Sequence, residues 1–213
     1  MRVAVTGANS SVGQNFMAHA AKQSDMRVVA VVRSEKAFAS LPSYEQIRPH
    51  NIPYEQVSEL ANALEGVTCV VHLAGILLES QSATYQGANI DTTAAVIEAS
   101  QAAGVEHIIF ISVLGANAHS SNSYFHSKGR AEQLVAESGI ASTVIRTPIL
   151  LGPGNAGAKG LLRTAAQGRA RLLGGGSYTM RPLDLDDLSR AILQVCRAPK
   201  EGATVHELVG PEE

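Results

Sequence analysis

The sequence predicts a doubly wound α/β fold, in which helices cover both faces of a parallel sheet. Short apolar, β-branched runs alternate with helix-like stretches along most of the 213 residues. Several runs are apolar at successive positions, which is typical of strands buried on both faces, and such strands occur in parallel sheets. Right-handed crossovers between these strands place helices on both sides of the sheet.

The first two thirds of the chain alternates strands with helices. Arg2–Thr6 predicts a strand, a glycine-containing turn follows it, and Gln14–Gln23 predicts a helix. The segment Ser34–Pro53 carries several prolines that interrupt any regular pattern. The remaining expected elements, in order, are a strand over Arg27–Arg33, a weak strand over Gln46–Ile52, a helix over Glu55–Leu64, a strand over Val67–Ala74, a helix over Ile90–Ala103, a strand over His107–Ser112, a helix over Tyr124–Ser138 and a strand over Ser142–Arg146.

After Arg146 the pattern changes to a loop rich in glycine and proline. The expected elements beyond it are a helix over Ala158–Gln167, a glycine triplet at Gly174–Gly176, an unassigned segment Met180–Leu185, a helix over Asp186–Arg197 and a short strand over Thr204–Leu208. Asp184, Asp186 and Asp187 cluster before the last helix, and we interpret them as an N-cap and first-turn charges. The apolar stripe of that helix, which includes Leu188 and Ile192, fits either core packing or a dimer face.

Composition excludes several classes of protein. The hydrophobic content is 45% and the formal net charge is −2, so the chain supports one ordinary core but no broad basic surface for nucleic acid or anionic membrane. Cys69 and Cys196 lie far apart in the sequence, and we interpret both as free thiols of a reducing compartment. Without a signal-peptide core or an apolar run long enough for a membrane span, the chain is expected to be cytoplasmic.

The turn after the first strand has the pattern of a dinucleotide-binding site. Gly7 lets the backbone turn sharply, Gly13 lets the next helix approach the sheet, and free amides at the helix N-terminus face a diphosphate. Ser10 stands where the usual motif has its middle glycine, so the match to the motif is partial. The alternative is a glycine-assisted turn with no ligand.

The second strand ends in Arg33, with Lys36 nearby, where a site that prefers NAD would place an acid. An arginine can bind a 2′-phosphate in a bidentate way and stack on adenine, so NADP is favoured over NAD. The alternative is a solvated arginine at a strand end.

Tyr124 and Lys128 lie four residues apart at the start of an expected helix, so both side chains emerge on one face. That geometry suits a proton relay. A free tyrosine has a pKa of about 10, and this pKa must fall by about 3 for the tyrosine to exchange protons near neutral pH. Ser112 ends the preceding strand and could offer its hydroxyl to a substrate carbonyl. The alternative is an exposed helix pair with little energetic effect.

Taken together, these motifs resemble the short-chain dehydrogenase/reductase superfamily, in its extended or atypical branch. The resemblance covers nearly the whole chain and is nearest to the group that contains NAD(P)-binding reductase-like proteins and the nucleotide-binding accessory subunit of respiratory complex I. The matching segments are TGANSSVG (Thr6–Gly13), HLAG (His72–Gly75), Asn89, ISVLGA (Ile111–Ala116), YFHSK (Tyr124–Lys128) and IRTPILLGPG (Ile145–Gly154).

The resemblance implies a Rossmann fold and specific roles for site residues. Tyr124 would be the general acid or base, Lys128 would hold the nicotinamide ribose and lower the tyrosine pKa, and Ser112 would orient the carbonyl or hydroxyl. Cofactor contacts would come from the turn residues Gly7, Asn9, Ser10, Ser11, Val12 and Gly13, and from Arg33, Lys36, Asn51, Ala74, Gly75, Lys128 and Pro148. Relatives often have a serine doublet where Val113 follows Ser112, and the alternatives to Ser112 as the catalytic serine are Ser120, Ser121 and Ser123.

The expected organisation is an NAD(P)-binding domain over residues 1–150 and a small C-terminal substrate lobe over residues 151–213, packed on the same domain. Extended members of the superfamily continue into further helices, so this lobe is expected to be incomplete. We expect an oxidoreductase or an epimerase/dehydratase-type enzyme that transfers hydride on a small carbonyl or hydroxyl compound, using NADP, with NAD also possible. The alternative is a non-catalytic NADP-binding scaffold or redox-sensing regulator. No metal site is expected, because the histidines lack ligand spacing, and a monomer and a homodimer both fit the sequence.

Overall fold

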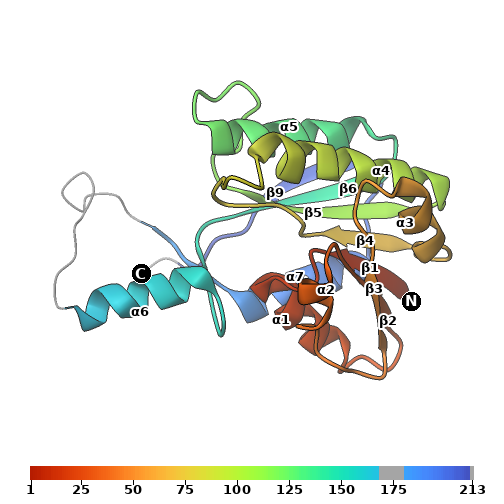
Figure 1. Ribbon diagram of the computed structural model, residues 1–213, viewed down its shortest axis with the longest axis horizontal. Coiled ribbons are helices and arrows are strands. Elements are labelled where there is room, and N and C mark those ends of the chain that lie inside the picture. The colour runs from red at the N-terminus through yellow and green to blue at the C-terminus, as the bar shows by residue number, and fades with distance from the viewer. Residues whose placement is uncertain (168–179, 212–213) are drawn as a thin grey trace.

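The core of the protein is a seven-stranded parallel sheet (Figure 1). The computed structural model describes residues 1–167 and 180–211. The strand order is β3-β2-β1-β4-β5-β6-β9, and every neighbouring pair is parallel. The strands are β1 (Arg2–Thr6), β2 (Arg27–Val32), β3 (Ile47–Asn51), β4 (Cys69–His72), β5 (His107–Val113), β6 (Ala141–Thr147) and β9 (Ala203–Glu207). The predicted doubly wound fold is confirmed.

Helices cover both faces of this sheet. In Figure 1, α3 (Val57–Ala63), α4 (Thr92–Ala102) and α5 (Ser123–Glu137) lie on one side, and α1 (Ser11–Ala20) and α7 (Leu185–Arg197) lie on the other. Each layer has its own apolar core: Leu60, Val96 and Val135 pack in the first, and Phe16, Met17, Leu188 and Ile192 pack in the second. Because the central strands are buried on both faces, they are apolar at successive positions.

Local capping residues account for one helix that begins earlier than expected and for one that was not expected. Ser10 caps α1 by accepting the Gly13 amide at 3.0 Å, so this helix begins at Ser11 and not at Gln14. Ser34 caps a short helix, α2 (Glu35–Phe38), inside the segment that had no clear pattern. The expected helix over Ile90–Ala103 is preceded by a π-helical turn, η1 (Gln86–Asp91).

The C-terminal third packs on the same body. Strand β9 pairs with β6, and α7 packs against α1 and the sheet. Two short strands, β7 (Leu150–Leu151) and β8 (Leu183–Asp184), pair with each other, and α6 (Ala156–Ala166) lies between them in sequence. The glycine triplet Gly174–Gly176 lies outside the described residues.

Two interpretations of the last helix are settled by its contacts. Asp184 caps α7 by accepting the Asp186 amide at 2.7 Å, which confirms the structural interpretation of the aspartate cluster. Leu188 and Ile192 are fully buried, so their stripe is core packing. Among the described residues, no helix is both long and apolar enough to cross a bilayer.

Candidate functional site

The parallel sheet brings the carboxyl ends of its strands to one edge. Strand β1 lies between β2 and β4, so the chain leaves β1 toward one side and returns to the other. In open α/β sheets, the crevice at such a reversal of strand order is where ligands bind. The segments that follow β1, β2 and β4 are therefore the first place to look for a site.

The turn after β1 has the tight backbone geometry that the sequence predicted. Gly7 has φ of +69°, and a Cβ at this position would lie 2.7 Å from the Ala74 nitrogen. At Gly13, a Cβ would lie 2.6 Å from the Ala8 carbonyl oxygen, because the start of α1 packs closely on the turn. Glycine is required at both positions by close backbone approach, and at Gly7 also by positive φ.

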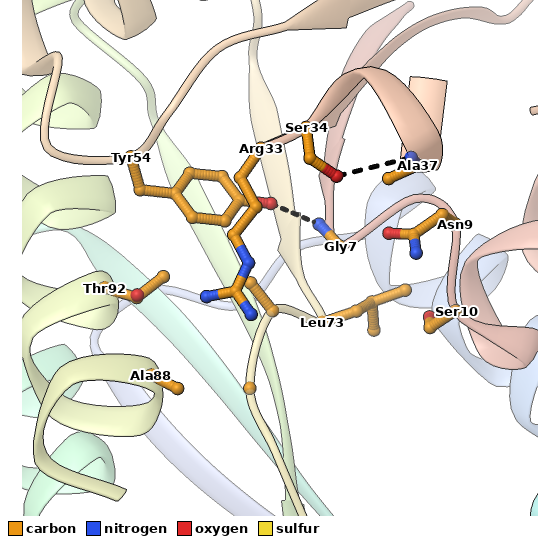
Figure 2. A pocket seen from close by; sticks show the side chains of 12 residues that line it. Gly7, Asn9, Ser10, Arg33, Ser34, Ala37, Tyr54, Leu73, Ala88 and Thr92 are labelled. Carbon is orange, nitrogen blue, oxygen red and sulfur yellow. Dashed lines mark hydrogen bonds between the residues drawn. The ribbon is translucent and has the colours of Figure 1, made fainter. Parts of the chain in front are cut away.

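A cavity of about 270 Å³ opens beside this turn (Figure 2). Its volume is just below the range of about 300–1,000 Å³ for small-molecule sites, and suits part of a dinucleotide. Exposed Arg33 extends its guanidinium across the cavity, and Tyr54 lies beside it. The lining residues are Gly7, Asn9, Ser10, Arg33, Ser34, Ala37, Tyr54, Leu73, Ala74, Gly75, Ala88 and Thr92.

The structure therefore brings six of the predicted cofactor residues together at one cavity: Gly7, Asn9, Ser10, Arg33, Ala74 and Gly75. The other predicted cofactor residues do not line it: Ser11, Val12, Gly13, Lys36, Asn51, Lys128 and Pro148. Asn51 instead donates its side-chain amide to Glu35 at 2.7 Å, which ties β3 to α2. Ser11 accepts a hydrogen bond from the Asn155 side chain at 3.3 Å, so the start of α6 reaches this turn.

Tyr54 is a site residue that the sequence did not reveal. It lies between β3 and α3, and its hydroxyl accepts the Gly7 amide hydrogen at 2.7 Å (Figure 2). It belongs to neither the strand pattern nor the helix pattern around it. The available signal was an aromatic residue with a polar end, which usually finds a hydrogen-bond partner when it is buried.

A chain of hydrogen bonds leads from the cavity to α5. Asn89 in η1 accepts the Ile76 amide at 2.7 Å and donates to the Ser127 hydroxyl at 2.9 Å. A Cβ on Gly75 would lie 2.8 Å from the Asn89 side-chain oxygen, so glycine leaves room for this contact. The Ser127 hydroxyl in turn donates to the Tyr124 carbonyl at 2.8 Å. The loop after β4 is thus fixed to the helix that carries the candidate catalytic pair.

Lys128 is buried below the start of α5. Its Nζ donates to the Ile111 carbonyl at 2.9 Å and lies 4.1 Å from the centre of the Phe110 ring. Burial lowers the Lys128 pKa to about 8, while nearby Glu132 opposes that change. The ammonium is therefore held close to its titration range by an apolar environment.

Tyr124 is half-buried beside a second tyrosine. Its ring centre lies 5.7 Å from that of Tyr85, whose hydroxyl donates to the Leu77 carbonyl at 3.0 Å. Burial raises the Tyr124 pKa to about 12, and Tyr85 adds to this effect, so the shift is opposite to the fall expected from the sequence. The phenol is therefore neutral at physiological pH, which suits a proton donor better than a base.

Ser112 and His72 occupy buried positions near the same edge. The Ser112 side chain is 1% exposed, and its hydroxyl has no hydrogen-bond partner among the described residues.

The His72 ring is hydrogen-bonded to the hydroxyls of Thr6 at 2.6 Å and Thr93 at 2.9 Å, and burial lowers its pKa to about 3. His72 is therefore a buried core histidine with both ring nitrogens hydrogen-bonded. Within the described ranges, no group of His, Cys, Asp and Glu side chains is arranged to hold a metal ion.

Comparisons with known proteins agree with this geometry. A sequence profile described as NAD(P)H-binding matches residues 7–175. A ceramide reductase of Caulobacter vibrioides is 26% identical over 204 residues, which is 94% of this chain and 62% of that protein. An uncharacterised sugar epimerase of Bacillus subtilis, YhfK, is 27% identical over 154 residues, which is 68% of this chain and 71% of that protein. The chain thus spans less than two thirds of the reductase.

Among solved structures, a UDP-glucuronic acid 4-epimerase from Bacillus cereus, in complex with NAD, superposes with a TM-score of 0.83. That comparison covers 100% of this chain and 79% of the epimerase at 20% sequence identity. The likeness supports the same sheet and helix arrangement in both proteins.

Proposed function

The chain belongs to the NAD(P)H-binding family, and from this premise we propose that it is an NADPH-dependent reductase of the short-chain dehydrogenase/reductase type, acting on a small carbonyl compound. The observation that carries the proposal is the convergence of the Gly7 turn, Arg33 and Gly75 on one cavity at the strand-order reversal. An oxidoreductase or epimerase is also consistent with the names of the relatives.

The residues present fit a dinucleotide. A Cβ at Gly7 or Gly13 would clash with the backbone of Ala74 or Ala8, so glycine at these positions keeps the turn and the start of α1 tightly packed at the cavity, where the N-terminus of α1 can face a diphosphate. We propose that exposed Arg33 and the hydroxyl of Ser34 bind the 2′-phosphate of NADP at the end of β2. NADPH, when bound, supplies a hydride to the substrate.

The protein's own residues would handle the proton. In the reducing direction, a carbonyl oxygen that gains hydride at its carbon needs a proton, and neutral Tyr124 can donate one. We propose that Lys128 holds a ribose hydroxyl and stabilises the resulting phenolate, since both side chains extend from the same face of α5. Ser112 would orient the carbonyl.

Calorimetric titration tests the cofactor, and steady-state kinetics tests the chemistry. Wild-type protein should bind NADPH more tightly than NADH, and Arg33→Ala should remove that difference, with Arg130→Ala on the exposed side of α5 as a control. Tyr124→Phe should abolish NADPH oxidation in the presence of a carbonyl substrate and leave NADPH affinity nearly unchanged. Equal affinities for the two nucleotides would refute the NADP preference, and full activity in Tyr124→Phe would refute the proton relay.

A specific observation favours a second candidate, a dinucleotide-binding protein without catalysis. Ser112 is almost fully buried, and neither Tyr124 nor Lys128 lines the cavity. Tight NADPH binding without oxidation across carbonyl substrates, including sphingoid and nucleotide-sugar ketones, would support this candidate over the reductase.

A further inference from the structure

Tyr54 connects three segments that are far apart in the sequence. Its ring packs in the apolar core that includes Val31 and Leu60, and the residue is only 4% exposed. Its hydroxyl reaches the cavity, where it accepts the Gly7 amide hydrogen at 2.7 Å and lies 3.4 Å from the Val31 carbonyl oxygen. Figure 2 shows the phenol directed at the turn from the side opposite α1.

The Gly7 amide needs such a partner. A backbone N–H that is withdrawn from water without an acceptor is costly, and Gly7 lies at a sharp turn with positive φ, where no strand neighbour accepts its hydrogen. The phenol supplies the missing acceptor from a different part of the chain. It therefore favours the one backbone conformation in which the turn can approach a diphosphate.

The same hydroxyl also connects the turn to β2. The Val31 carbonyl oxygen accepts the Ala8 amide hydrogen at 3.3 Å, and it also faces the Tyr54 hydroxyl. The Ala8 amide and the Tyr54 hydroxyl therefore meet at the same carbonyl of β2. Arg33 lies two residues further along the chain. The spacing between the turn and the arginine thus rests on the direct Ala8 hydrogen bond and on the contact that the phenol adds to it.

The phenol is suited to this place because it carries no charge. Burial raises the Tyr54 pKa to about 12, while the hydrogen bond from Gly7 and the charge of Arg33 oppose that change. A neutral hydroxyl can donate to Val31 while it accepts from Gly7. A phenolate at the same position would repel a diphosphate.

We propose that Tyr54 is a positioning residue for the dinucleotide, which holds the Gly7 amide and the end of β2 at the spacing that the diphosphate and the adenosine ribose require. This inference rests on the proposed dinucleotide-binding function. On this proposal, Tyr54 contributes to cofactor affinity by holding the Gly7 turn in place, and it does not contact the reacting groups.

The substitution Tyr54→Phe isolates the hydroxyl. Phenylalanine keeps the ring in the core, and in the free protein water can reach the half-buried Gly7 amide from the cavity. A bound dinucleotide excludes that water and leaves the amide without an acceptor, so the penalty falls on the complex. We expect NADPH and NADH to bind roughly 5- to 30-fold more weakly, and by the same factor, because both contain the diphosphate.

Calorimetric titration of wild type, Tyr54→Phe and the control Tyr44→Phe, well below their melting temperatures, tests the inference. Tyr44 is a more exposed tyrosine before β3, and its substitution should leave both affinities unchanged. A purely structural role for Tyr54 would lower the melting temperature without changing the dissociation constants, because nearly all molecules are native at the assay temperature. That result would overturn the inference.

Two further outcomes are distinguishable. Wild-type protein that binds neither NADPH nor NADH would overturn the proposed function, and the role of Tyr54 with it. If wild type binds NADPH and NADH but Tyr54→Phe binds them equally tightly, only the proposed role of Tyr54 is overturned. If Tyr54→Phe does not fold, amide exchange in wild type gives the answer: the Gly7 amide should be protected with and without NADPH, and rapid exchange in the complex would refute the hydrogen bond.

Discussion

Substitution of Lys128 by methionine should stabilise the protein at neutral pH while it damages the candidate site. The ammonium is buried, and its pKa in the folded protein is about 8 against an ordinary value of 10.5. The difference corresponds to about 3 kcal/mol of unfavourable free energy when the lysine is charged in the folded state. Methionine has a similar length and carries no charge, but it leaves the Ile111 carbonyl without the Nζ donor, which costs about 1 kcal/mol.

The pH dependence gives the sharper test. Between the folded and unfolded pKa values, the unfolded chain binds more protons at this lysine, so wild-type stability rises with pH over that interval. Below pH 8 the full penalty is present, and above 10.5 it is absent. Lys128→Met should therefore be about 2 kcal/mol more stable than wild type near pH 7, with the advantage lost or reversed by about pH 10.

Urea unfolding of wild type and Lys128→Met, followed by circular dichroism from about pH 6 to about pH 10, measures this difference. Titrating groups that do not interact with Lys128 act equally on both proteins and cancel in the comparison, and the nearby carboxylate of Glu132 is ionised throughout this pH range. Lys22→Met, at an exposed lysine after α1, is the matched control and should show no pH-dependent difference. If the free energy of unfolding changes with pH by the same amount in wild type and Lys128→Met, the claim that burial lowers the Lys128 pKa is refuted.

Three other predictions follow from backbone geometry and burial. Gly7→Ala should cost about 2–5 kcal/mol of stability and at least about tenfold in NADPH affinity, because it adds a backbone clash to the strain of positive φ. Gly104→Ala, at φ +70° with open space around it, should cost only about 1–2 kcal/mol in urea unfolding, and equal losses at the two sites would contradict the clash. Since the His72 pKa lies near 3, below its ordinary 6.5, stability should fall as the pH drops between these values, by about 3 kcal/mol from pH 7 to pH 4, and His72→Gln should flatten that slope. A thiol reagent should label Cys69 and Cys196 only upon unfolding, because both are nearly inaccessible, and their mutual hydrogen bond together with burial raises the Cys69 pKa; rapid labelling of native protein would refute this.

Expected and observed elements agree closely where the apolar positions in the sequence are the same positions that the fold buries. The strands Arg2–Thr6 and His107–Val113 are buried on both faces and are apolar at successive positions, so they could be predicted from sequence to within a residue or two. The helix that carries Tyr124 and Lys128 was predicted within one residue at each end. Strands β7 and β8, which pair with each other, were not predicted, because a strand of two residues has no periodicity to detect.

The candidate site divides in the same way. Gly7 and Arg33 could be assigned from the sequence because each lies directly after a strand, and parallel strands deliver their carboxyl ends to one edge. Tyr54 could not, because its contact with Gly7 spans 47 residues and depends on how the loop after β3 packs. The proximity of Cys69 and Cys196, whose sulfurs are 3.9 Å apart across 127 residues, likewise exists only after α7 has packed on the sheet.

By itself, the sequence determined the order of strands and helices and the backbone turn beside the first strand, since these depend on residues that are neighbours in the chain. Only the tertiary structure decided which of those residues share a cavity and how their proton affinities change. The pKa of Tyr124 rises and that of Lys128 falls because of burial, and burial is created by contacts between distant segments. Local pattern fixes elements, and long-range packing fixes the chemistry of the groups they carry.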